Sequence, residues 1–259
     1  MAKFDWYECT FFGADPLEII RRIERAHPFA MIEPDAPKYG YRVGQVFRHG
    51  GEPMARVWWE GNEGVHVSTT SSNAHDLAPL LREHGVHSVT RLDACEDWIE
   101  AGLFDRMAAH LTGYAVANGI TITQLGDWVR GEARTLYLGS KQSAVRLVLY
   151  EKGYEQGGDP NWVRLEVRVR PKGRMAREAV GKWTAGQAFG AARWVVAALE
   201  SLGWDHLQAQ AVGTVYRPSN DERARLAIRK QYGAVIGRWF DECGGDPAAF
   251  VAELLAEMV

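Results

Sequence analysis

The segment from Trp162 to Arg170 constrains the fold more than any other part of the sequence. It alternates strictly between apolar and charged residues: Val163, Leu165, Val167 and Val169 against Arg164, Glu166, Arg168 and Arg170. Successive side chains of a β-strand point to opposite faces of a sheet, so this pattern predicts a strand between a core and a charged face. One acid among three arginines indicates either a solvated, ion-paired surface or a face that binds a ligand.

The remaining chain predicts an α+β fold with a central, mostly antiparallel sheet, helices packed on it and a helical C-terminal part. Strands are expected at 4–12, 41–47, 55–59, 64–70, 86–97, 135–138, 144–150 and 162–170. Helices are expected at 15–26, 72–84, 104–117, 173–182, 185–202, 219–242 and 246–258. We therefore expect a catalytic core at 1–171, with 172–259 packed on the same domain because no linker separates them.

Composition excludes several broad classes of protein. The 259 residues are 46% apolar and 24% charged, which is typical of a soluble globular protein. The apolar runs are far shorter than the roughly 20 residues that span a bilayer, and no basic-then-apolar signal opens the chain. We therefore expect no membrane partner and a cytoplasmic location. The three cysteines are widely spread, which excludes a disulfide scaffold and a zinc site built from cysteines alone.

The formal charge of −3 conceals a basic middle segment. Residues 130–182 carry twelve Lys and Arg against six Asp and Glu, whereas the remainder carries eighteen against twenty-seven. Arg outnumbers Lys by 23 to 7, and its planar guanidinium suits phosphate groups. The Arg excess alone fits a GC-rich genome equally well, but its clustering predicts that 130–182 is the main phosphate-binding region.

Several common catalytic motifs are absent from the sequence. It contains no Gly-x4-Gly-Lys-Ser/Thr phosphate loop, no His-Glu-x-x-His and no Gly-x-Ser-x-Gly. None of the eight histidines forms a His-x-His pair, so a two-histidine metal site on one strand is excluded.

The first candidate site is the segment 91–97, Arg-Leu-Asp-Ala-Cys-Glu-Asp. On a strand, Arg91, Asp93, Cys95 and Asp97 would share one face. Carboxylates in such a place suit Mg²⁺ or Mn²⁺. The alternative is a salt bridge between Arg91 and Asp93, and for this segment taken alone we favour it.

The second candidate site lies between residues 135 and 153. The backbone donors of the Gly139-Ser140-Lys141 turn could hold a phosphate. Tyr150 ends an apolar strand, where a tyrosine is usually a core residue with a solvated hydroxyl. It could also be a nucleophile, with Arg146 and Lys152 supplying positive charge.

In this order along the chain, these segments resemble the trans-acting rolling-circle replication initiation factors of small plasmids and filamentous phages. The resemblance rests on Arg-x-Asp-x-x-x-Asp at 91–97, Tyr-x-Gly-Ser-x-x-Ser at 137–143, Tyr-Glu-Lys-Gly at 150–153 and Arg-x-Glu at 164–166. The opening Asp5-Trp6-Tyr7 is similar to phage members. The lack of His-x-His agrees, because the family does not use paired histidines.

The resemblance implies an enzyme that nicks and rejoins one DNA strand. Tyr150 would be the nucleophile, giving a 5′-phosphotyrosine and a 3′-hydroxyl that primes synthesis, with Tyr154 and Tyr137 as competing tyrosines. Asp93, Asp97 and Glu166 would hold one Mg²⁺ or Mn²⁺, with Glu96 or His66 as alternatives for the third ligand. The expected DNA contacts are Arg91, Ser140, Lys141, Arg146, Lys152, Arg164 and Arg168.

The implied partners are double-stranded and single-stranded origin DNA and a separate host helicase, with a homodimer as one option. Three alternatives stay open: a conjugative relaxase of the same superfamily, a non-catalytic DNA-binding regulator, and a generic α+β domain with a solvated arginine face. Nicking of a supercoiled plasmid in Mn²⁺ separates the initiator and the relaxase from the other two.

Overall fold

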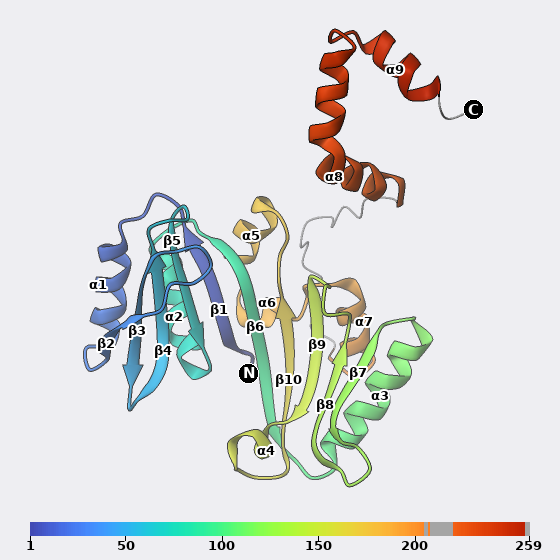
Figure 1. Cartoon of the computed structure of the whole chain (residues 1–259). Coiled ribbons are helices and arrows are strands. Elements are labelled where there is room, and N and C mark those ends of the chain that lie inside the picture. Colours follow the sequence, from blue (N-terminus) through green and yellow to red (C-terminus); the bar gives the residue numbers. More distant parts are fainter. Residues whose placement is uncertain (205–206, 208–219, 257–259) are drawn as a thin grey trace. The chain divides into compact units, whose positions relative to one another are not determined.

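The structure is a computed structural model that describes residues 1–204, 207 and 220–256. Its contacts divide the chain into two compact units, Met1–Thr214 and Val215–Val259. The first unit is built around an antiparallel sheet covered by helices, which confirms the predicted α+β class (Figure 1).

Within the described residues the sheet has ten strands in the order β2-β3-β4-β5-β1-β6-β10-β9-β8-β7. The strands are β1 (Lys3–Phe11), β2 (Met31–Asp35), β3 (Val43–His49), β4 (Glu52–Trp59), β5 (Val65–Thr70), β6 (Ser88–Ile99), β7 (Ile122–Asp127), β8 (Glu132–Leu138), β9 (Val145–Glu151) and β10 (Trp162–Val169). Adjacent strands pair antiparallel throughout.

The sheet consists of two halves, each continuous in sequence. The first six strands of the chain form one half, and the last four form the other as a simple meander (Figure 1). The halves meet where β6 pairs with β10, and we call this line the seam. Across the seam Asp97 lies opposite Arg164 and Asp93 lies opposite Arg168.

One face of the sheet forms the apolar core with the helices. The helices of the first unit are α1 (Pro16–Ala26), α2 (Ser72–Glu83), α3 (Leu103–Ala117), the short α4 (Lys152–Gln156), α5 (Arg174–Val180), α6 (Ala185–Ala188) and α7 (Arg193–Glu200). Apolar residues of every one except α4 join Leu92, Val167 and other strand residues in a single cluster. The opposite side of the sheet carries Asp93 and Asp97 of β6 and the charged residues of β10, and we call it the polar face.

The alternation in β10 produces the predicted strand. Val163, Leu165, Val167 and Val169 are all buried in the core cluster, so the charged residues between them point to the polar face. Helix α1 also begins as predicted: the Asp15 side chain accepts a hydrogen bond from the Leu17 amide at 3.0 Å, and Pro16 occupies the first turn.

The structure differs from the prediction at both sheet edges and in one helix. Strands β2 and β7 were not predicted: each pairs on one side only and is largely exposed, so its sequence lacks a clear apolar alternation. The prediction of a single helix at 185–202 is wrong, because α6 and α7 are separate helices with Gly190 between them. Helix α4 (Lys152–Gln156) lies between the strands expected at 144–150 and 162–170, where no helix is predicted.

Gly153 in α4 is expected to be required for the turn that joins β9 to β10. A Cβ atom at Gly153 would lie 1.8 Å from the backbone oxygen of Asp159, and backbone cannot move aside cheaply. Gly153→Ala should therefore lower the free energy of unfolding by about 1–3 kcal/mol, the range typical of overpacking. Gly158→Ala is the matched control, since its Cβ would meet only Trp162 at an ordinary 3.6 Å. Urea unfolding measures the free energy of unfolding of both variants. Equal values for Gly153→Ala and Gly158→Ala would contradict the steric argument.

The second unit contains α8 (Asn220–Glu242) and α9 (Pro247–Ala256), close to the helices predicted there. Residues 219 and 257–258 of those predictions lie outside the described residues. The Phe250 ring packs edge-on against Trp239 and Phe240, with centroids 5.4 and 5.8 Å apart. Helices α5 to α7 group with the sheet rather than with this unit, and the packing of 215–259 on the sheet stays a prediction. None of the described helices combines the length and apolar character needed to cross a membrane.

Candidate active site

Three strands at the middle of the sheet bring the predicted catalytic residues together on the polar face. Asp93 lies on β6, Glu166 on β10 and Tyr150 on β9, and these strands are neighbours. In the ladder Glu166 lies opposite Cys95 on one side and Val148 on the other, while Tyr150 lies opposite Arg164. Their sequence neighbours Leu92, Val167 and Leu149 point into the core, which leaves these three on the other face.

The hydroxyl of Tyr150 donates a hydrogen bond to Glu166 Oε2 at 3.2 Å. Burial raises the pKa of Tyr150 well above its ordinary value, and the negative charge of Glu166 raises it further. Lys152, predicted to support a phenolate, instead binds Glu155 at 2.6 Å, with its Nζ 5.6 Å from the Tyr150 ring centre. Tyr150 is therefore a protonated phenol at neutral pH, and its hydroxyl is in direct contact with Glu166.

Asp93 is a buried carboxylate, 1% exposed, between two arginines. Arg91 Nε contacts its two oxygens at 3.1 and 2.9 Å. Arg168 Nε lies 2.5 Å from Glu166 Oε1 and 3.9 Å from Asp93 Oδ2. Burial and the nearby Glu166 nevertheless raise the pKa of Asp93 to about 7. The two guanidinium groups thus do not fully offset the effect of burying Asp93 beside Glu166.

Asp5 is a site residue that the sequence analysis did not single out. The pairing of β1 with β6 is irregular between Phe4 and Trp6, which places Asp5 at a bulge. Its Oδ1 accepts a hydrogen bond from Arg164 Nη1 at 2.7 Å. Burial and the charge of Glu166 raise its pKa. The one signal for it in the sequence was the Asp5-Trp6-Tyr7 resemblance.

Within the described residues, Asp97 does not join Asp93 and Glu166 in a metal-binding group. It lies four residues from Asp93 on the same strand, about 13 Å along it. It contacts Arg164 Nε and Nη2 at 2.6 and 2.9 Å, and Lys3 Nζ at 2.6 Å. Burial alone would raise its pKa, but the hydrogen bonds from Arg164 and Lys3 outweigh it and hold the pKa at about 2. Asp97 is thus already neutralised by protein cations.

The two alternative third ligands do not join the pair either. Glu96 lies opposite the core residue Leu165 and so belongs to the other face of the sheet. His66 on β5 contacts Thr10 Oγ1 through Nδ1 at 2.9 Å and Glu8 Oε1 through Nε2 at 3.2 Å.

The donor chemistry at Asp93 and Glu166 fits a hard divalent cation. In the part of the chain that the structure describes, no three His, Cys, Asp or Glu residues form a metal-binding group. Mg²⁺, however, commonly takes one or two protein carboxylates and completes its shell with water and substrate phosphate oxygens. The raised pKa of Asp93 shows that its negative charge is unfavourable beside Glu166, so a further positive charge would stabilise the two carboxylates.

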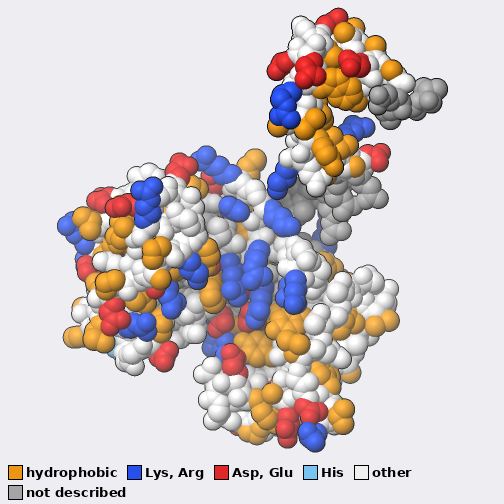
Figure 2. Space-filling view, viewed as in Figure 1, with side chains coloured by type: hydrophobic (Ala, Val, Ile, Leu, Met, Phe, Trp, Pro, Cys, Tyr) orange, Lys and Arg blue, Asp and Glu red, His pale blue; other side chains and the backbone are white. Residues whose placement is uncertain are grey.

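The residues expected to contact DNA occupy different environments. Arg146 is buried, donates to the Gly139 carbonyl at 3.2 Å and lies over the Tyr137 ring. Ser140 Oγ lies 2.9 Å from Ser143 Oγ, and Lys141 is exposed. Arg164 is 5% exposed and its described contacts are to Asp97 and Asp5. Figure 2 shows Lys and Arg side chains gathered over the middle of the sheet, with acidic side chains beside them.

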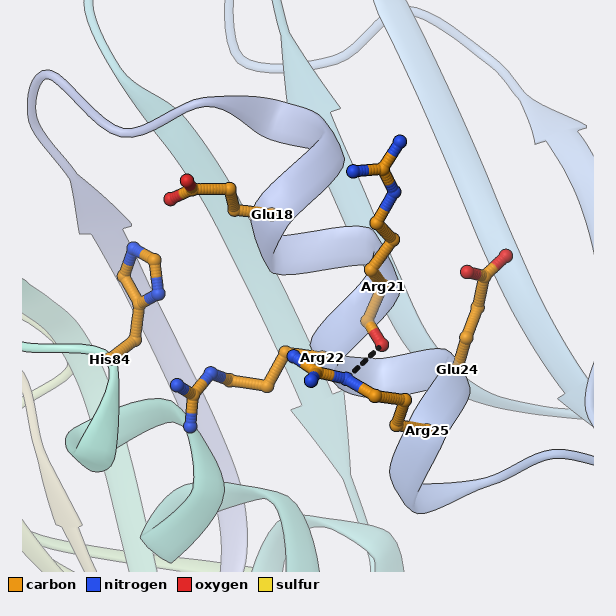
Figure 3. Close-up of a pocket in the computed structure, with 6 residues that line it drawn as sticks. All are labelled: Glu18, Arg21, Arg22, Glu24, Arg25 and His84. Atoms are coloured by element: carbon orange, nitrogen blue, oxygen red, sulfur yellow. Dashed lines mark hydrogen bonds between the residues drawn. The ribbon is translucent and has the colours of Figure 1, made fainter.

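A separate hollow lies on the helices, away from these residues (Figure 3). It is lined by Glu18, Arg21, Arg22, Glu24, Arg25 and His84, from α1 and the end of α2. The charges there are mixed, and Arg25 Nε donates to the Arg21 carbonyl at 3.3 Å. It contains none of the predicted site residues.

The pKa of Asp93 predicts how stability depends on pH without metal. An ordinary Asp has a pKa near 3.8, so between about pH 4 and 7 the folded protein retains a proton that the unfolded chain releases. The contribution of Asp93 to stability should therefore be present at low pH and lost as pH rises through this window. Urea unfolding in chelator at pH 5 and 7.5 measures this loss, and Asp93→Asn should remove it. An unchanged pH dependence in Asp93→Asn would contradict the prediction.

Comparisons with known proteins concern the sequence family and the overall fold. Residues 89–200 match the sequence model of the replication initiation factor family, which confirms the resemblance for this segment. The structure is similar to that of a rolling circle replication initiator protein from Geobacillus stearothermophilus, with a TM-score of 0.54 and 18% sequence identity. The match covers 81% of this chain and 98% of that chain, and it shows a shared fold. A search of curated proteins finds no match.

Proposed function

We propose that this protein is a rolling-circle replication initiator that nicks and rejoins one strand of origin DNA through Tyr150. The observation that carries the proposal is the Tyr150 hydroxyl held 3.2 Å from Glu166, beside Asp93 and two arginines on the polar face. The segment 89–200, which matches the family model, includes Tyr150, Glu166 and Asp93, and this supports the proposal.

In the proposed reaction, the Tyr150 oxygen attacks the scissile phosphorus in line. Its proton passes to Glu166 Oε2, which already accepts its hydrogen bond. The bond from phosphorus to the 3′-oxygen breaks, giving a 5′-phosphotyrosine and, after protonation, a free 3′-hydroxyl. The phosphodiester energy is conserved in the new bond, so the reverse attack by a 3′-hydroxyl rejoins the strand without ATP.

Charged groups around Tyr150 have distinct proposed roles. Asp93 and Glu166 would hold one Mg²⁺ or Mn²⁺, which when bound supplies positive charge to the phosphate oxygens. Arg168 and Arg91 position the two carboxylates and add to the positive potential at the phosphate. Asp97 and Arg164 form a structural ion pair that joins β6 to β10.

The reaction defines the proposed partners. The substrate is origin DNA, double-stranded for recognition and single-stranded where it is cut. Unwinding would need a separate host helicase, because the sequence has no phosphate loop for ATP. The proposed place of action is the host cytoplasm, where plasmid or phage DNA replicates.

The test is a nicking assay with the full chain and a supercoiled plasmid that carries the origin of the protein's own genetic element. We expect open-circular product and a covalent protein–DNA adduct with Mg²⁺ or Mn²⁺, and neither product in chelator. Origin binding without any nick, in either cation, would favour the non-catalytic regulator instead.

A further inference from the structure

Two aromatic side chains on the polar face lie on either side of the Asp93–Glu166 pair. Trp6 on β1 is opposite Asp93 in the ladder. Tyr137 on β8 is opposite Val148, which in turn is opposite Glu166. Both rings are partly exposed, unlike the buried aromatics of the core.

Each ring is paired with arginine. The guanidinium carbon of Arg91 lies 3.8 Å from the ring centre of Trp6. That of Arg146 lies 4.4 Å from the ring centre of Tyr137, and that of Arg168 lies 5.7 Å from it. Each of the two rings therefore has a guanidinium group close to it, and the two carboxylates lie on strands between the rings.

The indole of Trp6 is fixed in place by polar contacts. Its Nε1 donates to Glu8 Oε2 at 3.1 Å. Glu8 Oε1 in turn contacts His66 Nε2 at 3.2 Å and accepts from Thr90 Oγ1 at 3.4 Å. A ring that is already immobilised loses little conformational entropy when a flat ligand stacks on it.

The row from Trp6 to Tyr137 runs across the strands rather than along them. It crosses β1, β6, β10, β9 and β8, which are consecutive in the sheet. Four steps of about 4.8 Å give a length of roughly 19 Å. A polymer that alternates flat bases with phosphates matches a row of aromatic and guanidinium groups, and only unpaired bases can stack on protein rings.

We propose that a single strand of DNA crosses the polar face between Trp6 and Tyr137, with one base stacked on each ring. This inference rests on the proposed function, because it places the scissile phosphate between the two bases, at Tyr150. It assigns Trp6 and Tyr137 as positioning residues, which hold one base on each side of the cut, a few nucleotides apart, and take no part in the chemistry.

The test measures binding of a single-stranded origin oligonucleotide to the full chain over a range of salt, in a Tyr150→Phe background that prevents cleavage. Trp6→Leu and Tyr137→Leu should each weaken binding by about 5- to 100-fold at every salt concentration, as loss of one stacked base does. Trp6→Phe and Tyr137→Phe keep a ring and should retain most of the affinity.

Two control variants separate stacking from charge. Lys141→Ala removes an exposed cation, so the slope of log binding constant against log salt concentration should fall by about one. Trp6→Leu and Tyr137→Leu should leave that slope unchanged. Phe29→Ala removes an aromatic ring that is 86% exposed and outside the row, and should change neither quantity. Equal losses in the Leu and Phe variants, or the same loss on duplex DNA, would overturn the proposal.

Photocrosslinking tests the contact without any substitution in the row. Oligonucleotides with 5-iododeoxyuridine at positions around the cut should crosslink to the peptides that contain Trp6 and Tyr137. Crosslinks in a protein that does not nick would support the stacking row while refuting the proposed function. Nicking in a protein whose crosslinks fall elsewhere would refute the row and leave the proposed function intact.

Discussion

Replacing Tyr150 with phenylalanine is expected to reduce nicking to the uncatalysed background and to eliminate the covalent protein–DNA adduct. The variant keeps the ring and lacks only the oxygen that would attack phosphorus. It also loses the hydrogen bond to Glu166, which should cost about 1 kcal/mol of stability and leave the fold intact. Binding of origin DNA should be retained, because electrostatic contacts with phosphates do not require the hydroxyl.

The measurement traps the adduct on a suicide oligonucleotide and maps the modified peptide by mass spectrometry. Tyr154→Phe is the matched control, since Tyr154 lies four residues away and is 44% exposed in α4. It should nick at the parent rate. A phosphotyrosine found at Tyr154 or Tyr137 would refute the choice of residue and preserve the mechanism, whereas no adduct in the parent protein would favour a binding-only role.

The second large effect is expected from Glu166→Gln, which preserves shape and removes one negative charge. The glutamine can still accept a hydrogen bond from Tyr150, but it is no longer a base or an anionic ligand. Nicking should fall by at least the factor of about 10²–10⁴ that general bases contribute. We also expect Mn²⁺ to raise the melting temperature of the parent by binding the folded state, and this rise should be absent in Glu166→Gln.

Glu155→Gln is the control for this charge change, because Glu155 pairs with Lys152 at the surface of α4. It should keep both the nicking rate and the stabilisation by Mn²⁺. Full nicking by Glu166→Gln, or full activity of the parent in chelator, would contradict the assignment of the carboxylate pair.

The sequence could predict which residues share the polar face because that depends only on local periodicity. The alternation in 162–170 correctly placed Glu166 and Arg168 on one side of a strand and the valines on the other. The same argument placed Asp93 on the face shared with Arg91.

What the sequence could not predict is register, because register depends on partners distant in the chain. Asp97 fits the family spacing, but only the pairing with β10 puts it opposite Arg164, whose guanidinium binds it together with Lys3. Asp5 was missed for a related reason: a bulge changes which way a side chain points, and strand periodicity assumes no bulge. Strands β2 and β7 were not predicted because an edge strand pairs on one side only and is largely exposed, so its sequence shows little alternation of apolar and polar residues.

The seam between the two half-sheets has a consequence for how the protein is made. Strands β1 to β6 are complete once residue 99 has been synthesised, and β7 to β10 are not complete until residue 169. Until then β6 has an unpaired edge, which is open to wrong partners. Asp93 comes from the earlier half, whereas Tyr150 and Glu166 come from the later one. A nascent or truncated chain that ends before β10 would therefore lack Glu166, so premature fragments should not contain the complete proposed site.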